Sequence, residues 1–249
     1  MNAQLFHIIN LIIILVVFIF LIRYIWDIFF SQNYSPVAWQ CARKAGKINK
    51  KLVILEEKYP DKVRFFNFWF QVERLKRDDI PGAFAEAGVY KGESARVIHQ
   101  MDPDRAFHLF DTFNGFPEKD LLYETGEAAT YTNKNFADTH VRQVINKIDG
   151  NENIFIHEGY FPDTAKELKD ETFALVNLDL DLYVPTKAAL EFFYPRLSPG
   201  GVIIIHDYNP KWQGICKAVD EFVSAIPEPL VLVPDMDGTC MIIRYKIIV

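Results

Sequence analysis

A short apolar segment that runs into a glycine-bearing turn constrains the fold of this chain more than any other feature. The run from Phe84 to Val89 follows a Pro-Gly pair, as a buried strand would, and a segment of helical character comes after it. Gly88 and Gly92 bracket the turn between them, where a ligand can approach the backbone and face the free N–H groups of the helix. The spacing is Glu-x-Gly-x-x-x-Gly, so Glu86 stands where a dinucleotide-binding fingerprint has its first glycine.

Strand-like and helix-like segments alternate from this point to the C-terminus. Thr164 and Glu167 have the spacing of a capping box, which predicts a helix between the third and fourth strands. Five strands linked by crossovers and a final hairpin predict an α/β fold: a doubly wound, mostly parallel, Rossmann-like sheet with a C-terminal antiparallel strand pair. Ligands of such sheets bind at the carboxyl ends of the strands. Further strands are predicted over residues 106–110, 154–156, 173–178, 202–205, 230–233 and 240–245, and helices over 63–76, 136–148, 185–194 and 215–225.

The N-terminal segment from Leu5 to Ile22 is almost entirely apolar. As a helix it would be about 27 Å long, close to the hydrocarbon thickness of a bilayer. We predict an N-terminal transmembrane helix, because the segment lacks the basic start and the small-residue cleavage site of a signal peptide. A buried core helix is the alternative. The positive-inside rule places the rest of the chain in the cytoplasm, because basic residues follow the segment at Arg23, Arg43, Lys44, Lys47, Lys50 and Lys51.

The composition argues against several classes of function. A net charge of −6 leaves no basic face that would suit a nucleic-acid partner. Cys41, Cys216 and Cys240 lie far apart in the sequence, and the chain has no Cys-x-x-Cys pair. This pattern indicates free thiols in a reducing compartment, and neither a disulfide framework nor a zinc site.

Acidic residues follow the predicted strands at the edge where a ligand is expected. Asp111 ends the second strand, where a carboxylate commonly accepts hydrogen bonds from ribose hydroxyls; a turn aspartate is the alternative. Asp179 and Asp181 end the fourth strand and, two residues apart, project to the same side. With His206 or Asp207 after the fifth strand, they could hold a divalent cation that helps a hydroxyl lose its proton. One carboxylate could instead act as a general base without metal, or the acids could cap the following helix.

A polar stretch over residues 123–135 lies beside this predicted site in the sequence. It is rich in Tyr and Thr and has no strong periodicity. Loops of this kind commonly carry specificity, so we predict that it forms a lid.

Five blocks of the sequence resemble the macrocin O-methyltransferase family, whose members use S-adenosylmethionine to methylate sugar hydroxyls of natural products. The blocks are residues 84–94, 110–118, 159–164, 177–183 and 197–208, and they occur in the order of the family. The resemblance extends over residues 78–245. It implies a class I methyltransferase sheet with S-adenosylmethionine as its cofactor.

The resemblance also implies roles for individual residues. It places Asp111 on the ribose of the cofactor and a divalent cation on Asp179, His206 and Asp207. The catalytic residues predicted from the strand ends are Asp179 and Asp181. His206 stands where the family has the first Asp of an Asp-Asp-Tyr motif, and an imidazole there shifts the preference of the site from magnesium toward manganese. The cofactor-binding residues that it implies are Glu86, Gly88, Tyr90, Gly92, Ser94, Asp111, Phe113 and Gly159.

These features together predict a membrane-anchored, S-adenosylmethionine-dependent O-methyltransferase, assisted by a divalent cation, that acts on a sugar hydroxyl of a glycan, glycolipid or natural product. The predicted organisation is a membrane anchor over residues 1–30, a helical linker or lid region over 31–80 and a methyltransferase domain over 81–249. An NAD-binding oxidoreductase on the same sheet is one alternative, and Glu86 in place of the first glycine counts against it. A non-catalytic membrane-tethered scaffold is another, and the intact Asp111, Asp179 and Asp207 count against that. The acceptor and the oligomeric state stay open, a homodimer included.

Overall fold

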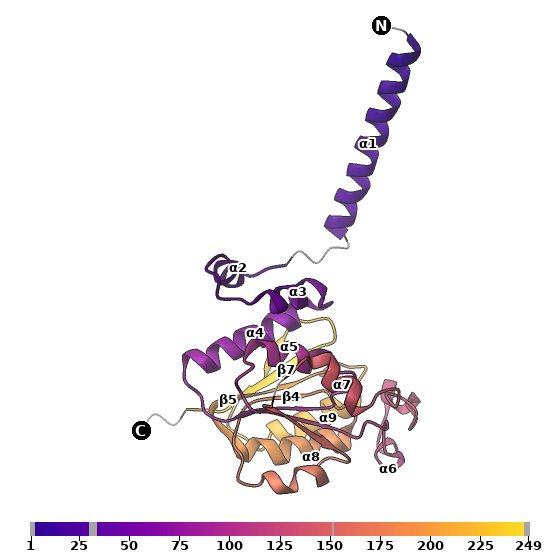
Figure 1. The fold of residues 1–249 in the computed structure, drawn as a ribbon. Coiled ribbons are helices and arrows are strands. Elements are labelled where there is room, and N and C mark those ends of the chain that lie inside the picture. The colour runs from indigo at the N-terminus through magenta and orange to yellow at the C-terminus, as the bar shows by residue number, and fades with distance from the viewer. Residues whose placement is uncertain (1–2, 30–33, 151, 247–249) are drawn as a thin grey trace. The chain divides into compact units, whose positions relative to one another are not determined.

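The computed structural model describes residues 3–29, 34–150 and 152–246, which divide into two units, residues 1–47 and 48–249, described separately below. The first unit contains α1 (Ala3–Phe29) and α2 (Val37–Lys44) (Figure 1). Within the described residues, α1 holds the one segment long and apolar enough to cross a membrane, Gln4–Trp26, with 23 residues, a mean hydropathy of 3.2 and no part buried. The predicted apolar helix is therefore confirmed, and its insertion into a membrane stays a prediction. Residues 1, 2 and 30 of the predicted anchor and 31–33 of the predicted linker lie outside the described residues.

The second unit is built on a seven-stranded sheet with the order β3-β2-β1-β4-β5-β7-β6. The strands from β3 to β5 in this order run parallel, and β7 is antiparallel to both β5 and β6. This is the predicted doubly wound sheet with its C-terminal antiparallel pair. The strand order reverses between β1 and β4, so a ligand site is expected at the carboxyl ends of these two strands. The strands are β1 (Ala83–Ala87), β2 (Phe107–Asp111), β3 (Ile154–Glu158), β4 (Phe173–Leu178), β5 (Leu197–Ile205), β6 (Val231–Val233) and β7 (Thr239–Ile243).

Helices cover both faces of this sheet (Figure 1). On one face α3, α4 and α7 pack around α5, and on the other face α8 packs against α9. Because side chains alternate along a strand, Ala83, Ala85 and Ala87 of β1 share the core of α8 and α9, whereas Glu86 points to α5. The helices are α3 (Lys50–Lys58), α4 (Lys62–Arg77), α5 (Glu93–Met101), α6 (Glu118–Leu121), α7 (Val141–Ile148), α8 (Tyr183–Phe193) and α9 (Gln213–Val223), with 3₁₀ turns η1 (Gly126–Thr130), η2 (Asp163–Leu168) and η3 (Tyr194–Arg196).

Two local predictions differ from the structure. The predicted capping box is wrong, because Thr164 already lies inside the 3₁₀ turn η2, where its N–H donates to the carbonyl oxygen of Tyr160. No side chain caps this turn. The fifth strand is also longer than its predicted range of residues 202–205, since β5 begins at Leu197 and contains Pro199. A shift of register between β4 and β5 accommodates the additional strand residues.

Candidate active site

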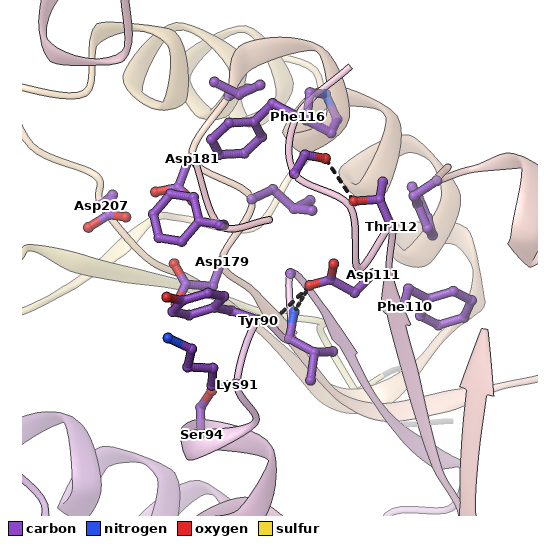
Figure 2. Close-up of a pocket in the computed structure, with 18 of the residues that line it drawn as sticks. Tyr90, Lys91, Ser94, Phe110, Asp111, Thr112, Phe116, Asp179, Asp181 and Asp207 are labelled. Carbon is purple, nitrogen blue, oxygen red and sulfur yellow. Dashed lines mark hydrogen bonds between the residues drawn. The ribbon is translucent and has the colours of Figure 1, made fainter. Parts of the chain in front are cut away.

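A cavity of about 640 Å³ opens at the carboxyl ends of β1, β2 and β4 (Figure 2). This volume suits a small-molecule ligand, and the place is the one where a doubly wound sheet binds its ligands. Among the described residues, the cavity wall does not include Glu86, Gly92, Phe113 or His206. The predicted site residues that do line it are Gly88, Tyr90, Ser94, Asp111, Gly159, Asp179, Asp181 and Asp207.

Asp111 fastens the turn after β1 to the end of β2. Its Oδ2 accepts hydrogen bonds from the backbone N–H groups of Val89, at 2.8 Å, and Tyr90, at 2.7 Å (Figure 2). Its Oδ1 accepts one from the N–H of Phe113 at 2.7 Å. Phe113 therefore supports the predicted ribose site without lining the cavity. A carboxylate has about four acceptor positions, so one remains for a ligand hydroxyl beside the three backbone bonds.

Gly88 and Gly92 have different roles in this turn. Gly88 has a φ of +86°, and a Cβ placed on it would lie 1.8 Å from the carbonyl oxygen of Asp179, so only glycine lets the turn pass this close to the end of β4. Gly92 has a φ of +75° and is the N-cap residue of α5. A Cβ there would lie 3.1 Å from a side-chain methyl of Val144, so Gly92 positions α5 against α7. Gly159, after β3, donates its N–H to the carbonyl oxygen of Asp111 at 2.9 Å.

Three aspartates form an acidic cluster at the ends of β4 and β5. Asp179, Asp181 and Asp207 each offer an oxygen within 4.8 Å of the others (Figure 2). Burial, followed by repulsion from Asp179, raises the pKa of Asp207 to about 7 and holds the pKa of Asp181 well above its usual range. Burial also raises the pKa of Asp179. A divalent cation is a chemical match for such a crowded, all-oxygen donor set.

An aromatic wall faces this acidic cluster; it consists of Phe116, Tyr131, Phe136 and Trp212, all of which line the cavity. Phe116 stacks on Tyr131 with ring centroids 5.4 Å apart, and Tyr131 packs against Trp212 at 5.5 Å. Phe136 meets both Phe116 and Tyr131 edge-on. Burial and the carboxylates of Asp181 and Asp207 raise the pKa of Tyr131. The predicted lid thus contributes Tyr131 to the cavity.

A family model described as "Macrocin-O-methyltransferase (TylF)" matches residues 61–244. The chain belongs to the macrocin O-methyltransferase family. The match contains all seven strands, the acidic cluster and the turn around Gly88, and it confirms the resemblance seen in the sequence.

Two curated proteins that this chain resembles are each 31% identical to it. The "8-demethyl-8-(2,3-dimethoxy-alpha-L-rhamnosyl)-tetracenomycin-C 4'-O-methyltransferase" of Streptomyces olivaceus aligns over 156 residues, 58% of this chain and 60% of the relative. The "Mycinamicin III 3''-O-methyltransferase" of Micromonospora griseorubida aligns over 171 residues, 58% of this chain and 62% of the relative. The aligned part therefore spans less than two thirds of either relative. The solved structure of "the O-methyltransferase NovP" has a TM-score of 0.63 and 26% identity, and the match covers 74% of this chain and 81% of that one.

In this member of the family, Glu86 lies behind the cavity wall. Its side chain is fully buried, and its Oε1 accepts a hydrogen bond from the hydroxyl of Ser94 at 2.7 Å. Within the described part of the chain its Oε2 has no hydrogen-bond partner. Burial raises the pKa of Glu86 to about 8, with a contribution from the carboxylate of Asp179. Ser94, which does line the cavity, connects Glu86 to it.

His206 lies outside the acidic cluster, so the prediction that its imidazole is a metal ligand is corrected. Its Nε2 lies 2.7 Å from Oδ1 of Asn177 and its Nδ1 lies 3.0 Å from Oγ1 of Thr239, so both ring nitrogens have protein partners. The ring packs edge-on against Phe68 of α4. Burial lowers the pKa of His206 well below its usual range. Side chains of β5 point alternately to the two faces of the sheet, and the side chain of His206 follows this pattern and points to α4. Asp207 has a φ of +61° and lines the cavity instead.

Arg64 of α4 is a cavity residue that the sequence did not indicate. Its Nε lies 3.0 Å from Oδ2 of Asp235 and its Nη2 lies 3.2 Å from Oδ2 of Asp237, in the loop between β6 and β7. Its charge opposes the effect of burial and offsets part of the rise in the pKa values of Asp179 and Asp207. Arg64 therefore offsets part of the negative charge of the acidic cluster. No local motif could reveal it, because its partners are more than 170 residues away in the sequence.

Proposed function

We propose that this chain is an S-adenosylmethionine-dependent O-methyltransferase that acts on a sugar hydroxyl of a glycan, glycolipid or natural product. The observation that carries the proposal is one cavity with two chemically different sides: the turn of Gly88 with Asp111 on one side, and the acidic cluster on the other. Family membership and the printed names of the two curated relatives support it, since both names specify methylation of a hydroxyl and one specifies a rhamnosyl group.

The first side fits the cofactor. Bound S-adenosylmethionine supplies a methyl group that its sulfonium already activates, so the protein has mainly to align two reactants. Gly88 leaves the backbone open to close approach, and Asp111 keeps one acceptor position for a ribose hydroxyl. The aromatic wall offers apolar surface on which a sugar ring can pack opposite the acidic cluster.

The second side would orient and deprotonate the acceptor hydroxyl. Asp179, Asp181 and Asp207 would hold a divalent cation, which polarises a hydroxyl and favours loss of its proton. With His206 outside the cluster, the donor set is all oxygen and favours magnesium over manganese. Asp179 or Asp181 is placed to accept the proton as a general base.

Calorimetry on the full chain in detergent, with S-adenosylhomocysteine and with NAD, tests the cofactor. Transfer of a labelled methyl group to methyl rhamnoside, other simple glycosides and UDP-sugars tests the reaction. We expect S-adenosylhomocysteine and not NAD to bind, and a sugar to become labelled. Binding of NAD alone would restore the oxidoreductase alternative, and cofactor binding with a full acceptor panel left unlabelled would favour the non-catalytic scaffold.

Asp111→Ala should weaken S-adenosylhomocysteine binding by about 1.5–3 kcal/mol, the usual effect of losing a hydrogen bond to a charged group. The loss includes the ribose contact and the three backbone bonds that shape the turn. Calorimetry measures the affinity, and thermal unfolding checks that the variant is folded. Asp138→Ala is the matched control, because Asp138 binds the same turn only through the side chains of Tyr90 and Lys91. Unchanged affinity in folded Asp111→Ala would contradict the assignment.

The membrane proposal is a single span by α1 with the methyltransferase domain in the cytoplasm. The apolar segment Gln4–Trp26 supports the span, and the basic residues that follow it support the orientation. In a background without native cysteines, Gln4→Cys should react with an impermeant maleimide in intact cells, and Lys50→Cys only after permeabilisation. The reverse labelling pattern would exclude a cytoplasmic domain. Extraction of the labelled protein from membranes by alkaline carbonate would exclude the span.

A further inference from the structure

Asp120 of α6 has a buried carboxylate oxygen that no described protein group satisfies. The residue is 2% exposed, and its Oδ1 accepts a hydrogen bond from the hydroxyl of Tyr160 at 3.1 Å. Across the residues that the structure describes, its Oδ2 has no partner. Burial raises the pKa of Asp120, as expected for a carboxyl group that lacks compensation. Buried acceptors in folded proteins nearly always have a donor, so an unmatched one on a cavity wall points to a ligand.

The surroundings of Asp120 define the shape of that ligand. Asp120 lines the cavity beside the segment that follows β3, since its partner Tyr160 comes two residues after that strand ends. The other walls of this end are mainly apolar. Phe110 and Phe161 pack edge to face with ring centroids 5.5 Å apart. Pro117, whose carbonyl oxygen accepts a hydrogen bond from the N–H of Asp120 at 3.0 Å, and Gly159, next to Tyr160, also line the cavity here.

This apolar end is separate from the acidic cluster. Asp120 lies near the end of β3, which is the edge strand of the sheet, whereas the acidic cluster lies at the ends of β4 and β5. Strands β2 and β1 separate the two places, and β2 ends at Asp111. A ligand that reaches from the cluster past Asp111 to Asp120 therefore ends in an apolar slot with one buried hydrogen-bond acceptor. A flat heterocycle with one amino group matches that slot.

We propose that Asp120 is a specificity-determining residue that accepts, through Oδ2, a hydrogen bond from the exocyclic amino group of the cofactor's adenine. Tyr160 is a positioning residue in this arrangement, because its hydroxyl holds Oδ1 and leaves Oδ2 toward the slot. The inference rests on the proposed function. It identifies how the site distinguishes adenine from a base of the same shape that carries a carbonyl group in that position.

The test compares S-adenosylhomocysteine with S-inosylhomocysteine, in which a carbonyl oxygen replaces the amino group, by calorimetry on the full chain in detergent. The wild-type protein should prefer the adenine compound by about 10- to 100-fold, because the carbonyl would face an unmatched carboxylate. Asp120→Ala should bring the two affinities within about 3-fold of each other, mainly by weakening the adenine compound. Glu118→Gln, an exposed acid on the same helix, is the control and should keep the wild-type preference.

Asp120→Asn gives a second readout that a folding defect cannot imitate. The amide can keep its oxygen on Tyr160 and present its NH₂ group to the slot, which suits the carbonyl of the inosine compound. The preference should therefore shift toward S-inosylhomocysteine. If both Asp120 variants keep the wild-type preference for S-adenosylhomocysteine, the inference is overturned while the proposed function stands. The same conclusion follows if the variants change the KM for the acceptor and leave the cofactor affinity unchanged. A wild-type protein that binds neither compound would overturn both proposals.

Discussion

Asp179→Asn should lower the rate of methyl transfer by about 10²–10⁴-fold, the usual contribution of a positioned acid–base group. Asparagine has nearly the same shape, and the backbone of residue 179 can keep its hydrogen bond to Ala87. The substitution removes the charge that would take the proton of the acceptor hydroxyl or hold a cation beside Asp181 and Asp207. The cofactor side of the cavity keeps Gly88 and Asp111, so S-adenosylhomocysteine should bind with nearly unchanged affinity. Single-turnover rates and calorimetry measure the two quantities.

Asp237→Asn is the matched control for this effect. Asp237 also lines the cavity, but its side chain is 61% exposed and pairs with Arg64 outside the cluster. Its substitution should change the rate by only a few-fold, since exposed ion pairs contribute little. A folded Asp179→Asn protein with the wild-type rate would remove Asp179 from catalysis. Full activity of the wild-type protein in EDTA would refute the cation and leave Asp179 or Asp181 as a simple general base.

The sheet and the strand-end acids could be predicted because both depend on local sequence. Apolar runs separated by helical segments specify parallel strands with crossovers, and the carboxyl ends of those strands necessarily meet at one edge. Asp111, Asp179 and Asp207 stand directly at such ends, and the structure brings them to one cavity. Of the predicted metal ligands, His206 lies outside the acidic cluster, because the direction of its side chain depends on the neighbouring Asn177 and Thr239. Cation binding by Asp179 and Asp207 stays a prediction.

Other parts of the site depend on contacts between distant segments. Arg64 reaches the cavity because Asp235 and Asp237 hold it, and Asp120 faces it because Tyr160 holds the other carboxylate oxygen. Neither pairing has a motif. The role of Asp111 in shaping the turn was also hidden, since a strand-end aspartate predicted to bind a ribose and one that shapes a turn look the same in the sequence. The structure shows three backbone bonds to this side chain, so the turn aspartate and the ligand-binding aspartate are compatible.

Gly88→Ala should lower the free energy of unfolding by about 4 kcal/mol or more, at the upper end of single substitutions. The new methyl group would lie 1.8 Å from the carbonyl oxygen of Asp179 and 2.6 Å from its carbonyl carbon, and the backbone on both sides is fixed. The N–H of Gly88 donates to Phe110 at 2.9 Å, and the N–H of Asp179 donates to Ala87 at 2.9 Å. Relief of the clash therefore requires β1 and β4 to separate at the very edge where the cavity opens. Urea unfolding followed by tryptophan fluorescence measures the loss.

Gly92→Ala separates this clash from backbone strain, because Gly92 lies in the same turn with a similar φ of +75°. Its Cβ would meet a methyl group of Val144, which can move, so the variant should lose only the left-handed strain of about 1–2 kcal/mol. The difference between the two losses in the free energy of unfolding is then the cost of the steric clash between the added methyl group and the backbone of Asp179. Equal losses in both would show that the approach of Gly88 to Asp179 is not what requires glycine there. A larger loss for Gly88→Ala would connect the first glycine of the motif directly to the position of Asp179, the proposed general base.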